Sequence, residues 1–260
     1  MASQQSVEQQ RPSHPSDHFL VLLDVEFDHR SGTVVGRSPV RPALFAVETK
    51  VIRPSLVFAM LDFMSGYVTG RPAGPTIDMR MQMLGPAPTT GHLDLMVQPL
   101  RVGKRIVVSQ GSARDGDGRE FARATTTFMN MDSWSSTYPS PEDMVEPTFD
   151  DMLPIRIRDE RTIELVPTDR LLNGAIGTVQ GGVQSLLAEL CAQHAFGDRT
   201  PMMAIDIEAR FLSAQREWPM VATAERLPDD RGAIRCDVAI TDHTRQNLAT
   251  HVTLTMVPAR

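Results

Sequence analysis

The chain has 260 residues, of which 41% are apolar and 22% are charged, and its formal net charge is −6 at pH 7. This composition is typical of a globular protein with a buried core. The acidic balance, without runs of Lys or Arg, argues against nucleic acid or a membrane surface as the main partner.

Cysteine usage and the amino terminus indicate where such a chain works. Only Cys191 and Cys236 are present, without a C-x-x-C pair, so we expect neither a disulfide framework nor a thiolate metal site. No stretch reaches the ~20 apolar residues of a membrane span. Residues 1–17 are rich in Gln, Ser and Pro and lack a signal-peptide core, which predicts a disordered tail and a cytoplasmic protein.

The first half predicts one strand, one helix and then four strands. Phe19–Phe27 is rich in strand-forming residues, and Ser55–Val68 is long and apolar enough for a buried helix that carries a single carboxylate, Asp62. Four alternating runs then predict strands at Thr76–Leu84, His92–Leu100, Lys104–Ala113 and Glu120–Asn130.

The second half repeats this order after a polar, Pro-rich segment, 133–150, that we interpret as a linker. Ile155–Val166 predicts a strand, and Gly182–Phe196 predicts a mostly apolar helix that holds Glu189. Four further strands are predicted at Met203–Leu212, Pro219–Leu227, Ala233–Thr241 and Asn247–Val257.

Three pairs of matching positions in the two halves are separated by nearly the same number of residues. Asp62 and Glu189 are 127 residues apart, the segments around Asp78 and Asp206 are 128 apart, and Arg119 and Arg245 are 126 apart. Such a period predicts a tandem duplication, with one repeat at 18–132 and the other at 151–260. The shared place of Asp78 and Asp206 points to a structural role.

The predicted class is α+β. A single helix with a run of strands cannot bury both faces of its sheet alone. Wrapping a curved antiparallel sheet around the long apolar helix, and pairing two such units, solves this, and that arrangement is a double hotdog fold. Strands that come in runs disfavour a doubly wound α/β fold.

Residues 173–182, Asn-Gly-Ala-Ile-Gly-Thr-Val-Gln-Gly-Gly, lead straight into the second apolar helix. A helix N-terminus offers unpaired backbone N–H groups and a partial positive charge. Glycine there lets a ligand oxygen approach the backbone closely. The segment therefore predicts an oxyanion hole or an anion cradle, although Gly-Gly before a helix and Asn-Gly also occur in ordinary turns.

These residues resemble the hotdog acyl-CoA thioesterases, particularly the phenylacetyl-CoA type. That family carries an Asn, then His-Gly-Gly or Gln-Gly-Gly at a helix start, then a carboxylate nine residues after the His. Gln180 and Glu189 have that spacing. The chain departs from the pattern by Gln180 in the place of the commoner His, and by one extra residue after Asn173. Gln cannot titrate, so this position orients a carbonyl or a water.

The carboxylate that serves Gly181 should come from the other repeat. Gly181 and Glu189 are eight residues apart on one helix, or ~12 Å along its axis, which a Glu side chain cannot span comfortably. Asp62 is the candidate, as the resemblance also implies, because the related homodimers place this acid across their interface.

Comparison of the repeats predicts one working site and one lost site. Pro54 stands where the second repeat has Gly181, and proline has no N–H to donate. Thr76 stands where the second repeat has Ala204, and the resemblance implies that this hydroxyl holds a water. The working site would combine Asn173, Gln180 and Gly181 with Asp62 and Thr76, and the lost site would combine Pro54, Glu189 and Ala204.

The predicted function is hydrolysis of an acyl-CoA or related thioester, with a small acyl thioester as partner, no nucleic acid, no membrane, and neither a metal nor a redox cofactor. A homo-oligomer of such chains stays open. One alternative is a non-catalytic acyl-CoA binding or sensing protein. The alternative for Asp62 itself is a buried acid satisfied by neighbouring backbone groups or by Arg53. Another is a hydratase or dehydratase of this fold, against which the missing His at position 180 counts. His194 has no clustered partners and predicts no ligand.

Overall fold

The computed structural model describes residues 18–30, 32–47, 49–70, 74–131, 149, 153–173, 177–197, 200–214, 218–228, 232–242 and 247–259. The predicted tail at 1–17 lies outside these ranges, as does the predicted linker at 133–150 apart from Phe149. The Phe149 side chain is 1% exposed, and its ring meets Phe19 edge-on at a centroid distance of 5.4 Å.

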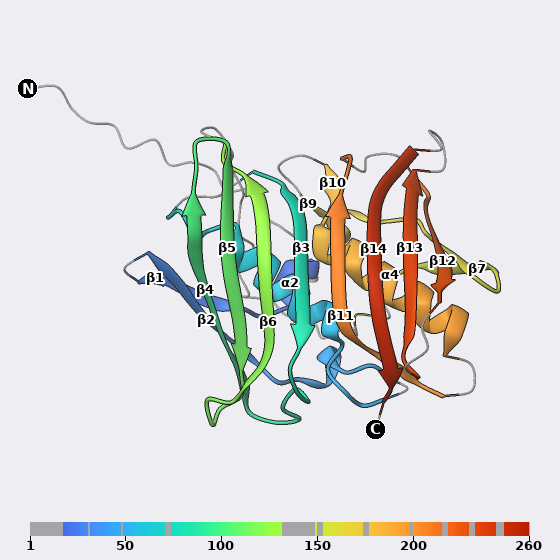
Figure 1. Cartoon of the computed structure of the whole chain (residues 1–260), viewed down its shortest axis with the longest axis horizontal. Helices are drawn as coiled ribbons and strands as arrows, with labels where there is room; N and C mark the ends of the chain where they lie inside the picture. Colours follow the sequence, from blue (N-terminus) through green and yellow to red (C-terminus); the bar gives the residue numbers. More distant parts are fainter. Residues whose placement is uncertain are drawn as a thin grey trace, which may run out of the picture.

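Twelve strands form one antiparallel sheet, and the helices α2 and α4 lie on one of its faces (Figure 1). The first half of the chain contributes β1 Glu26–Arg30, β2 Thr33–Pro39, β3 Thr76–Met83, β4 His92–Val102, β5 Ile106–Arg114 and β6 Glu120–Met129. The second half contributes β7 Ile155–Asp159, β8 Thr162–Leu165, β11 Met202–Phe211, β12 Met220–Leu227, β13 Ile234–Asp242 and β14 Asn247–Pro258.

The remaining elements are short, apart from the two helices that carry the core. The helices are α1 Phe19–Leu22, α2 Pro54–Ser65 and α4 Gly181–Phe196, with 3-10 turns η1 at Pro42–Leu44 and η2 at Asp169–Leu171. A second, two-stranded sheet joins β9 Leu172–Asn173 to β10 Thr178–Val179. Within the described residues, no helix is long and apolar enough to cross a lipid bilayer.

The strand order is mirrored about the middle of the sheet. Outward from the central pair β3–β11, the order is β6, β5, β4, β2, β1 on one side and β14, β13, β12, β8, β7 on the other. The register of β3 against β6 shifts between Thr76 and Asp78, and the register of β11 against β14 shifts between Ala204 and Asp206. The α+β class with a large antiparallel sheet is therefore confirmed.

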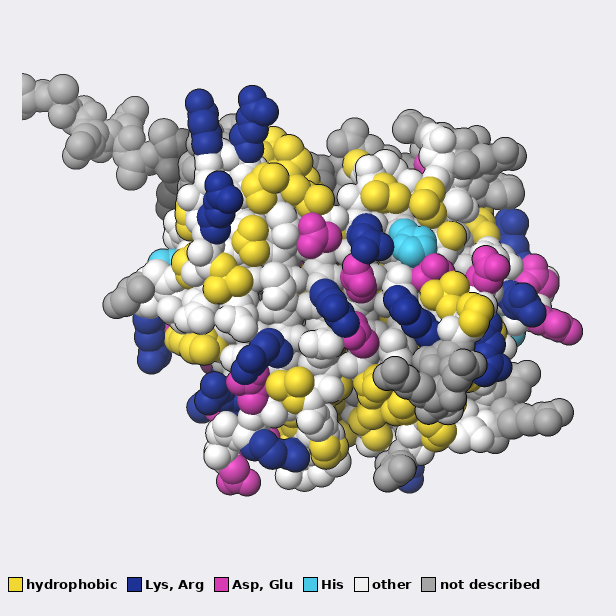
Figure 2. Space-filling model, viewed as in Figure 1, with side chains coloured by type: hydrophobic (Ala, Val, Ile, Leu, Met, Phe, Trp, Pro, Cys, Tyr) yellow, Lys and Arg dark blue, Asp and Glu magenta, His cyan; other side chains and the backbone are white. Residues whose placement is uncertain are grey.

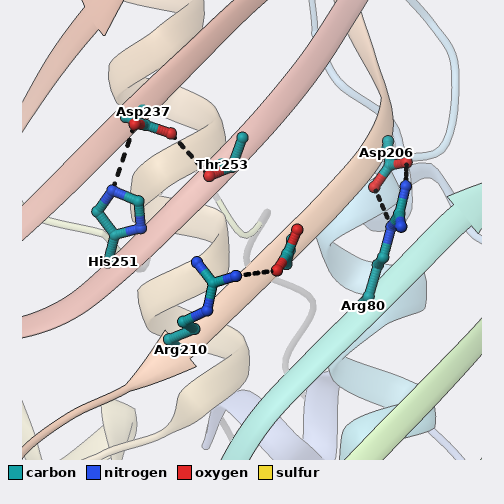
Figure 3. A network of polar contacts seen from close by, with 7 residues as sticks. Arg80, Asp206, Arg210, Asp237, His251 and Thr253 are labelled. Carbon is teal, nitrogen blue, oxygen red and sulfur yellow. Dashed lines mark hydrogen bonds and ion pairs between the residues drawn. The ribbon is translucent and has the colours of Figure 1, made fainter.

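The β3–β11 pair joins the two halves. On the side of the helices, the joint buries apolar side chains, among them Met79 and Ile207, which are fully buried. On the outer side, Asp206 accepts hydrogen bonds from Arg80 at 2.6 and 3.1 Å (Figure 3) and from Gln82 at 3.1 Å. A surface ion pair adds at most about 1 kcal/mol, so apolar burial and the backbone ladder hold the joint.

The helices α2 and α4 run antiparallel and pack at close range. Ser55 at the start of α2 bonds to Glu189 well inside α4, whereas Ala59 faces Gly182 near the start of α4. A Cβ at Gly182 would lie 2.4 Å from the Ala59 Cβ. Only glycine at position 182 permits this approach. The sheet covers α2 on one side and α4 covers it on the other, so the sequence of α2 is apolar nearly all round.

The prediction of one strand at Phe19–Phe27 was wrong. The chain forms the short helix α1, then turns at Asp24, whose φ is +48°, and begins β1 only at Glu26. His18 caps the helix by accepting a hydrogen bond from the Leu20 N–H at 3.2 Å. A short apolar run has no period that separates a buried strand from a buried helical turn, and packing of Phe19 against α4 decided between them.

The prediction of one strand before each helix was also wrong, because each helix is preceded by a hairpin. Ile155–Val166 divides into β7 and β8, and the turn between them is closed by a 2.8 Å hydrogen bond from the Arg161 N–H to Asp159. The corresponding strand β2 in the first half was missed.

Gly182→Ala should destabilise the protein by about 1–3 kcal/mol, because the new methyl group overpacks the contact between the helices. The free energy of unfolding in urea measures this cost. Ala59→Gly in the same chain should recover part of the loss, although Ala59→Gly alone destabilises. Additive effects of the two substitutions would contradict the proposed contact.

Candidate active site

Asp62 lies near the end of α2, and β3 positions its partner. The Thr76 hydroxyl donates a hydrogen bond of 2.7 Å to Asp62 Oδ1. Thr76 begins β3 beside the register shift, and such a bulge changes the direction of a side chain. The sequence comparison assigned this hydroxyl to a water; in the structure its proton is directed to the carboxylate. The water-holding role stays a prediction.

The surroundings of Asp62 favour its neutral form. Burial raises the pKa of Asp62 from 3.8 to about 6, and the hydrogen bond from Thr76 opposes this rise. Asp62 as a whole residue is partly exposed to solvent. A carboxyl group with a pKa near neutrality exchanges protons readily at physiological pH.

Gly181, the first residue of α4, lies beside this carboxylate. A Cβ at Gly181 would lie 3.2 Å from Asp62 Oδ2, although the two residues are far apart in sequence. The first N–H groups of a helix have no acceptor within the helix, and they carry the positive end of its dipole. The structure thus joins an acid from the first half of the chain to a donor from the second.

Gln180 and Asn173 flank the start of α4. Gln180 is the N-cap residue; its N–H donates to Leu171 O at 3.1 Å, and its partly exposed side chain makes no capping hydrogen bond. Asn173 pairs with Thr178 across β9 and β10. The structure describes the backbone of Asn173 but not its side chain, so its role stays a prediction.

Glu189 occupies the corresponding place at the other end of the helix pair. Its side chain is 1% exposed, and its Oε2 accepts a hydrogen bond of 3.0 Å from the Ser55 N–H at the start of α2. Pro54 begins that helix and has no N–H. The helix start at this end is therefore occupied by a protein carboxylate.

The residues around Glu189 are equally enclosed. Arg53 is 2% exposed and donates a hydrogen bond of 3.0 Å to the Gln193 side chain. Ala204 is fully buried and has no hydroxyl. The two ends of the helix pair thus have related geometry, but Asp62 is partly exposed, whereas Glu189 is buried.

Phe211 is a member of the site that the sequence did not reveal. Its Cζ would lie 3.1 Å from a Cβ at Gly181, so the ring borders the helix start on the side of β11. In the sequence, an aromatic residue at the end of a strand is typical of the hydrophobic core and does not indicate a functional site. Only the folded position showed its relation to Asp62.

Other reactive groups lie apart from this site. Cys191 and Cys236 form no disulfide and are buried. Burial raises the pKa of each thiol to about 12. His194 contacts the Asp159 carbonyl at 2.8 Å. In the part of the chain that the structure describes, no group of three or more His, Cys, Asp or Glu could hold a metal ion; that the chemistry needs none stays a prediction.

Comparisons with known proteins agree with this architecture. No family model matches the chain, and no curated protein matches it. Among solved structures, the tesB protein MAP1729c of Mycobacterium avium subspecies paratuberculosis superposes with a TM-score of 0.68 at 12% identity, over 92% of this chain and 98% of that one.

Two other structures extend the comparison. A hot dog fold protein of unknown function from Alicyclobacillus acidocaldarius gives a TM-score of 0.63 at 12% identity, over 96% of this chain and 99% of that one. The chain has the hotdog fold. A 12:0-ACP thioesterase from Umbellularia californica also shares this hotdog fold, with a TM-score of 0.63 at 8% identity, over 87% of this chain and 94% of that one.

Asp62→Asn should stabilise the protein at pH 8 and have little effect at pH 4. The raised pKa of about 6 means that the fold disfavours the ionised form, so the contribution of this group to stability is full below pH 4 and is lost as pH rises through 6. Thermal unfolding at both pH values measures the difference. Asp115→Asn is the control of opposite sign, because Arg119 lowers the pKa of Asp115. If Asp62→Asn changed the unfolding temperature equally at both pH values, this would contradict the raised pKa of Asp62.

Proposed function

We propose that this chain hydrolyses an acyl thioester at one composite site formed by α2, β3 and the start of α4. The observation that carries the proposal is the Asp62 carboxylate, with a pKa of about 6, beside Gly181 at a helix N-terminus. The thioesterase resemblance of residues 173–189 supports it. So does the fold shared with proteins described as thioesterases.

The start of α4 would bind the thioester carbonyl. The Gly181 N–H donates to the carbonyl oxygen, and the helix dipole stabilises the negative charge that develops there as the carbonyl carbon becomes tetrahedral. Gln180 and Asn173 orient the thioester or the attacking water with their amides. Pro54 could supply no such donor at the opposite end.

Asp62 would supply the base. In the general-base route, Asp62 takes a proton from water, the water oxygen bonds to the carbonyl carbon, and the C–S bond breaks as the sulfur leaves and receives that proton. In the nucleophilic route, an Asp62 oxygen bonds to the carbonyl carbon and the thiolate leaves, which gives a mixed anhydride. Water then hydrolyses the anhydride to the free acid and the Asp62 carboxylate, and the proton released goes to the thiolate. Thr76 holds the carboxylate in both routes.

The two halves would be diverged copies of one hotdog unit, at 18–132 and 151–260, each with a curved sheet around its long helix. The mirrored strand order and the matching register shifts near Thr76 and Ala204 support this. Each chain would then hold one working site, because Glu189 occupies the helix start at the other end. Duplication permits this loss, since one of two equivalent sites suffices.

The substrate would be an acyl-CoA or a related carrier thioester, processed in the cytoplasm without a metal or redox cofactor. The unbonded thiols agree with a reducing compartment. A non-catalytic acyl-CoA binding protein of this fold would have no use for a base of raised pKa. A hydratase would need a titrating group where Gln180 stands.

Asp62→Asn should lower kcat by about 10²–10⁴-fold, because the amide can accept no proton. Glu189→Gln, the matched amide substitution at the other end, should retain most activity. A panel of acyl-CoA thioesters, assayed with a thiol-reactive dye, gives both values. An equal loss in the two variants would show that both ends work, and full activity of Asp62→Asn would remove the proposed base.

The activity should fall below pH 6, as Asp62 becomes protonated. Thr76→Val removes the hydrogen bond that lowers the pKa of Asp62, so the acid limb of kcat/KM should move to higher pH. Profiles from pH 4 to 9 measure the displacement. An unchanged acid limb in Thr76→Val would assign the titration to another group.

A further inference from the structure

The hairpin between β4 and β5 ends in an exposed surface that is both apolar and cationic. Four apolar side chains are exposed there: Leu100 (57%), Val102 (58%), Ile106 (47%) and Met129 (43%). Three exposed cations lie among them in sequence: Arg101, Lys104 and Arg105. We call these seven residues the β4–β5 tip. Figure 2 shows Lys and Arg side chains beside hydrophobic ones at the upper left edge, where Figure 1 places this hairpin.

The backbone of the β4–β5 tip is well held, while its charges are not engaged. Asn130 fixes the turn through its N–H to Arg105 O at 2.8 Å and its side-chain amide to Gly103 O at 2.7 Å. None of the three cations forms an ion pair with another residue that the structure describes. A rigid, unneutralised surface of this kind is suited to an anionic partner.

The β4–β5 tip and the proposed site lie at the same end of the strands. Thr76 pairs with Phe128, Phe128 pairs with Val107, and Val107 pairs with Val102. This row of residues crosses three strand spacings, which places Val102 about 15 Å from Thr76. A partner held at the tip can therefore extend a flexible arm to Asp62.

The opposite edge, beside Glu189, differs in charge. The corresponding hairpin joins β12, which ends at Leu227, to β13, which begins at Ile234. The stretch 225–235 holds three acidic residues and three arginines (Glu225, Asp229, Asp230, Arg226, Arg231 and Arg235), so its charges cancel, whereas residues 100–106 hold three cations and no acidic residue. The cationic character thus accompanies the end of the molecule where the carboxylate is accessible.

We infer that the β4–β5 tip docks an acidic acyl carrier protein, whose phosphopantetheine arm delivers the thioester to Asp62; this rests on the proposed function. Free coenzyme A would use the cations but would leave four large apolar side chains exposed, which a folded partner covers. An anionic bilayer is disfavoured, because it would contact a broad face of the chain, whose formal net charge of −6 repels it.

Charge reversal tests the inference by kinetics. The K104E/R105E variant and its control R226E/R235E change the net charge equally, and the control residues are exposed on β12 and β13 near the opposite edge. One dodecanoyl group is presented either on coenzyme A or on a bacterial acyl carrier protein. In K104E/R105E, the ratio of kcat/KM for the carrier thioester to that for the CoA thioester should fall at least about 10-fold, and the control should leave it unchanged. An equal loss on both thioesters, which would assign the cations to the phosphates that both share, overturns the inference, as does no change.

Binding separates this inference from the proposed function. Asp62→Asn, which removes the proposed base, should bind the dodecanoyl carrier protein in fluorescence anisotropy, and K104E/R105E should weaken that binding at least about 10-fold. Salt should weaken it too. Binding at the tip without hydrolysis of any thioester by the unsubstituted chain would support the docking site and remove the proposed function. Hydrolysis of CoA thioesters without carrier binding would support the proposed function and remove the docking site. Carrier binding insensitive to K104E/R105E would remove the docking site alone.

Discussion

The antiparallel contact between α2 and α4 is the constraint on which the rest of the molecule depends. Because Gly182 lets the helices approach at Ala59, the start of each helix lies beside the carboxylate carried by the other. Asp62 meets Gly181 at one end, and Glu189 meets Ser55 at the other. The sheet encloses this pair, and its central joint β3–β11 brings Thr76 to Asp62.

The two ends differ because side-chain length and backbone chemistry differ within one geometry. The Glu189 side chain is one methylene longer than that of Asp62, and it reaches the Ser55 N–H directly. Pro54 removes the donor that precedes it. Asp62 is shorter, accepts its hydrogen bond from Thr76 and keeps contact with solvent. One carboxylate therefore bonds to a helix terminus, whereas the other belongs to a partly exposed residue.

The raised pKa of Asp62 has a thermodynamic cost. A carboxyl group whose pKa is raised to about 6 is ionised at neutral pH against the preference of its surroundings, and the fold is less stable for it. The proposed function needs a base with this preference. Phe211 borders the same helix start as Asp62, beside Gly181.

The sequence alone predicted the elements with a clear period, and it also predicted a duplication of the two halves, which stays a proposal. The helices around Asp62 and Glu189, the later strands of each half and the spacing of Asp62 and Glu189 all followed from local patterns, and the lost N–H of Pro54 followed from chemistry. The sequence did not reveal α1, β2 or the hairpin β7–β8, because short apolar runs have no distinguishing period.

Only the tertiary structure decided which groups meet. Phe211 at the helix start, the bond from Ser55 to Glu189 and the contact of Thr76 with Asp62 depend on packing between segments far apart in the chain. The position of the β4–β5 tip at the end of the strands nearest Asp62 also depends on this packing. Local sequence specifies backbone preference and chemistry within a few residues, but distances between strands and helices are set by how the whole core fills its volume.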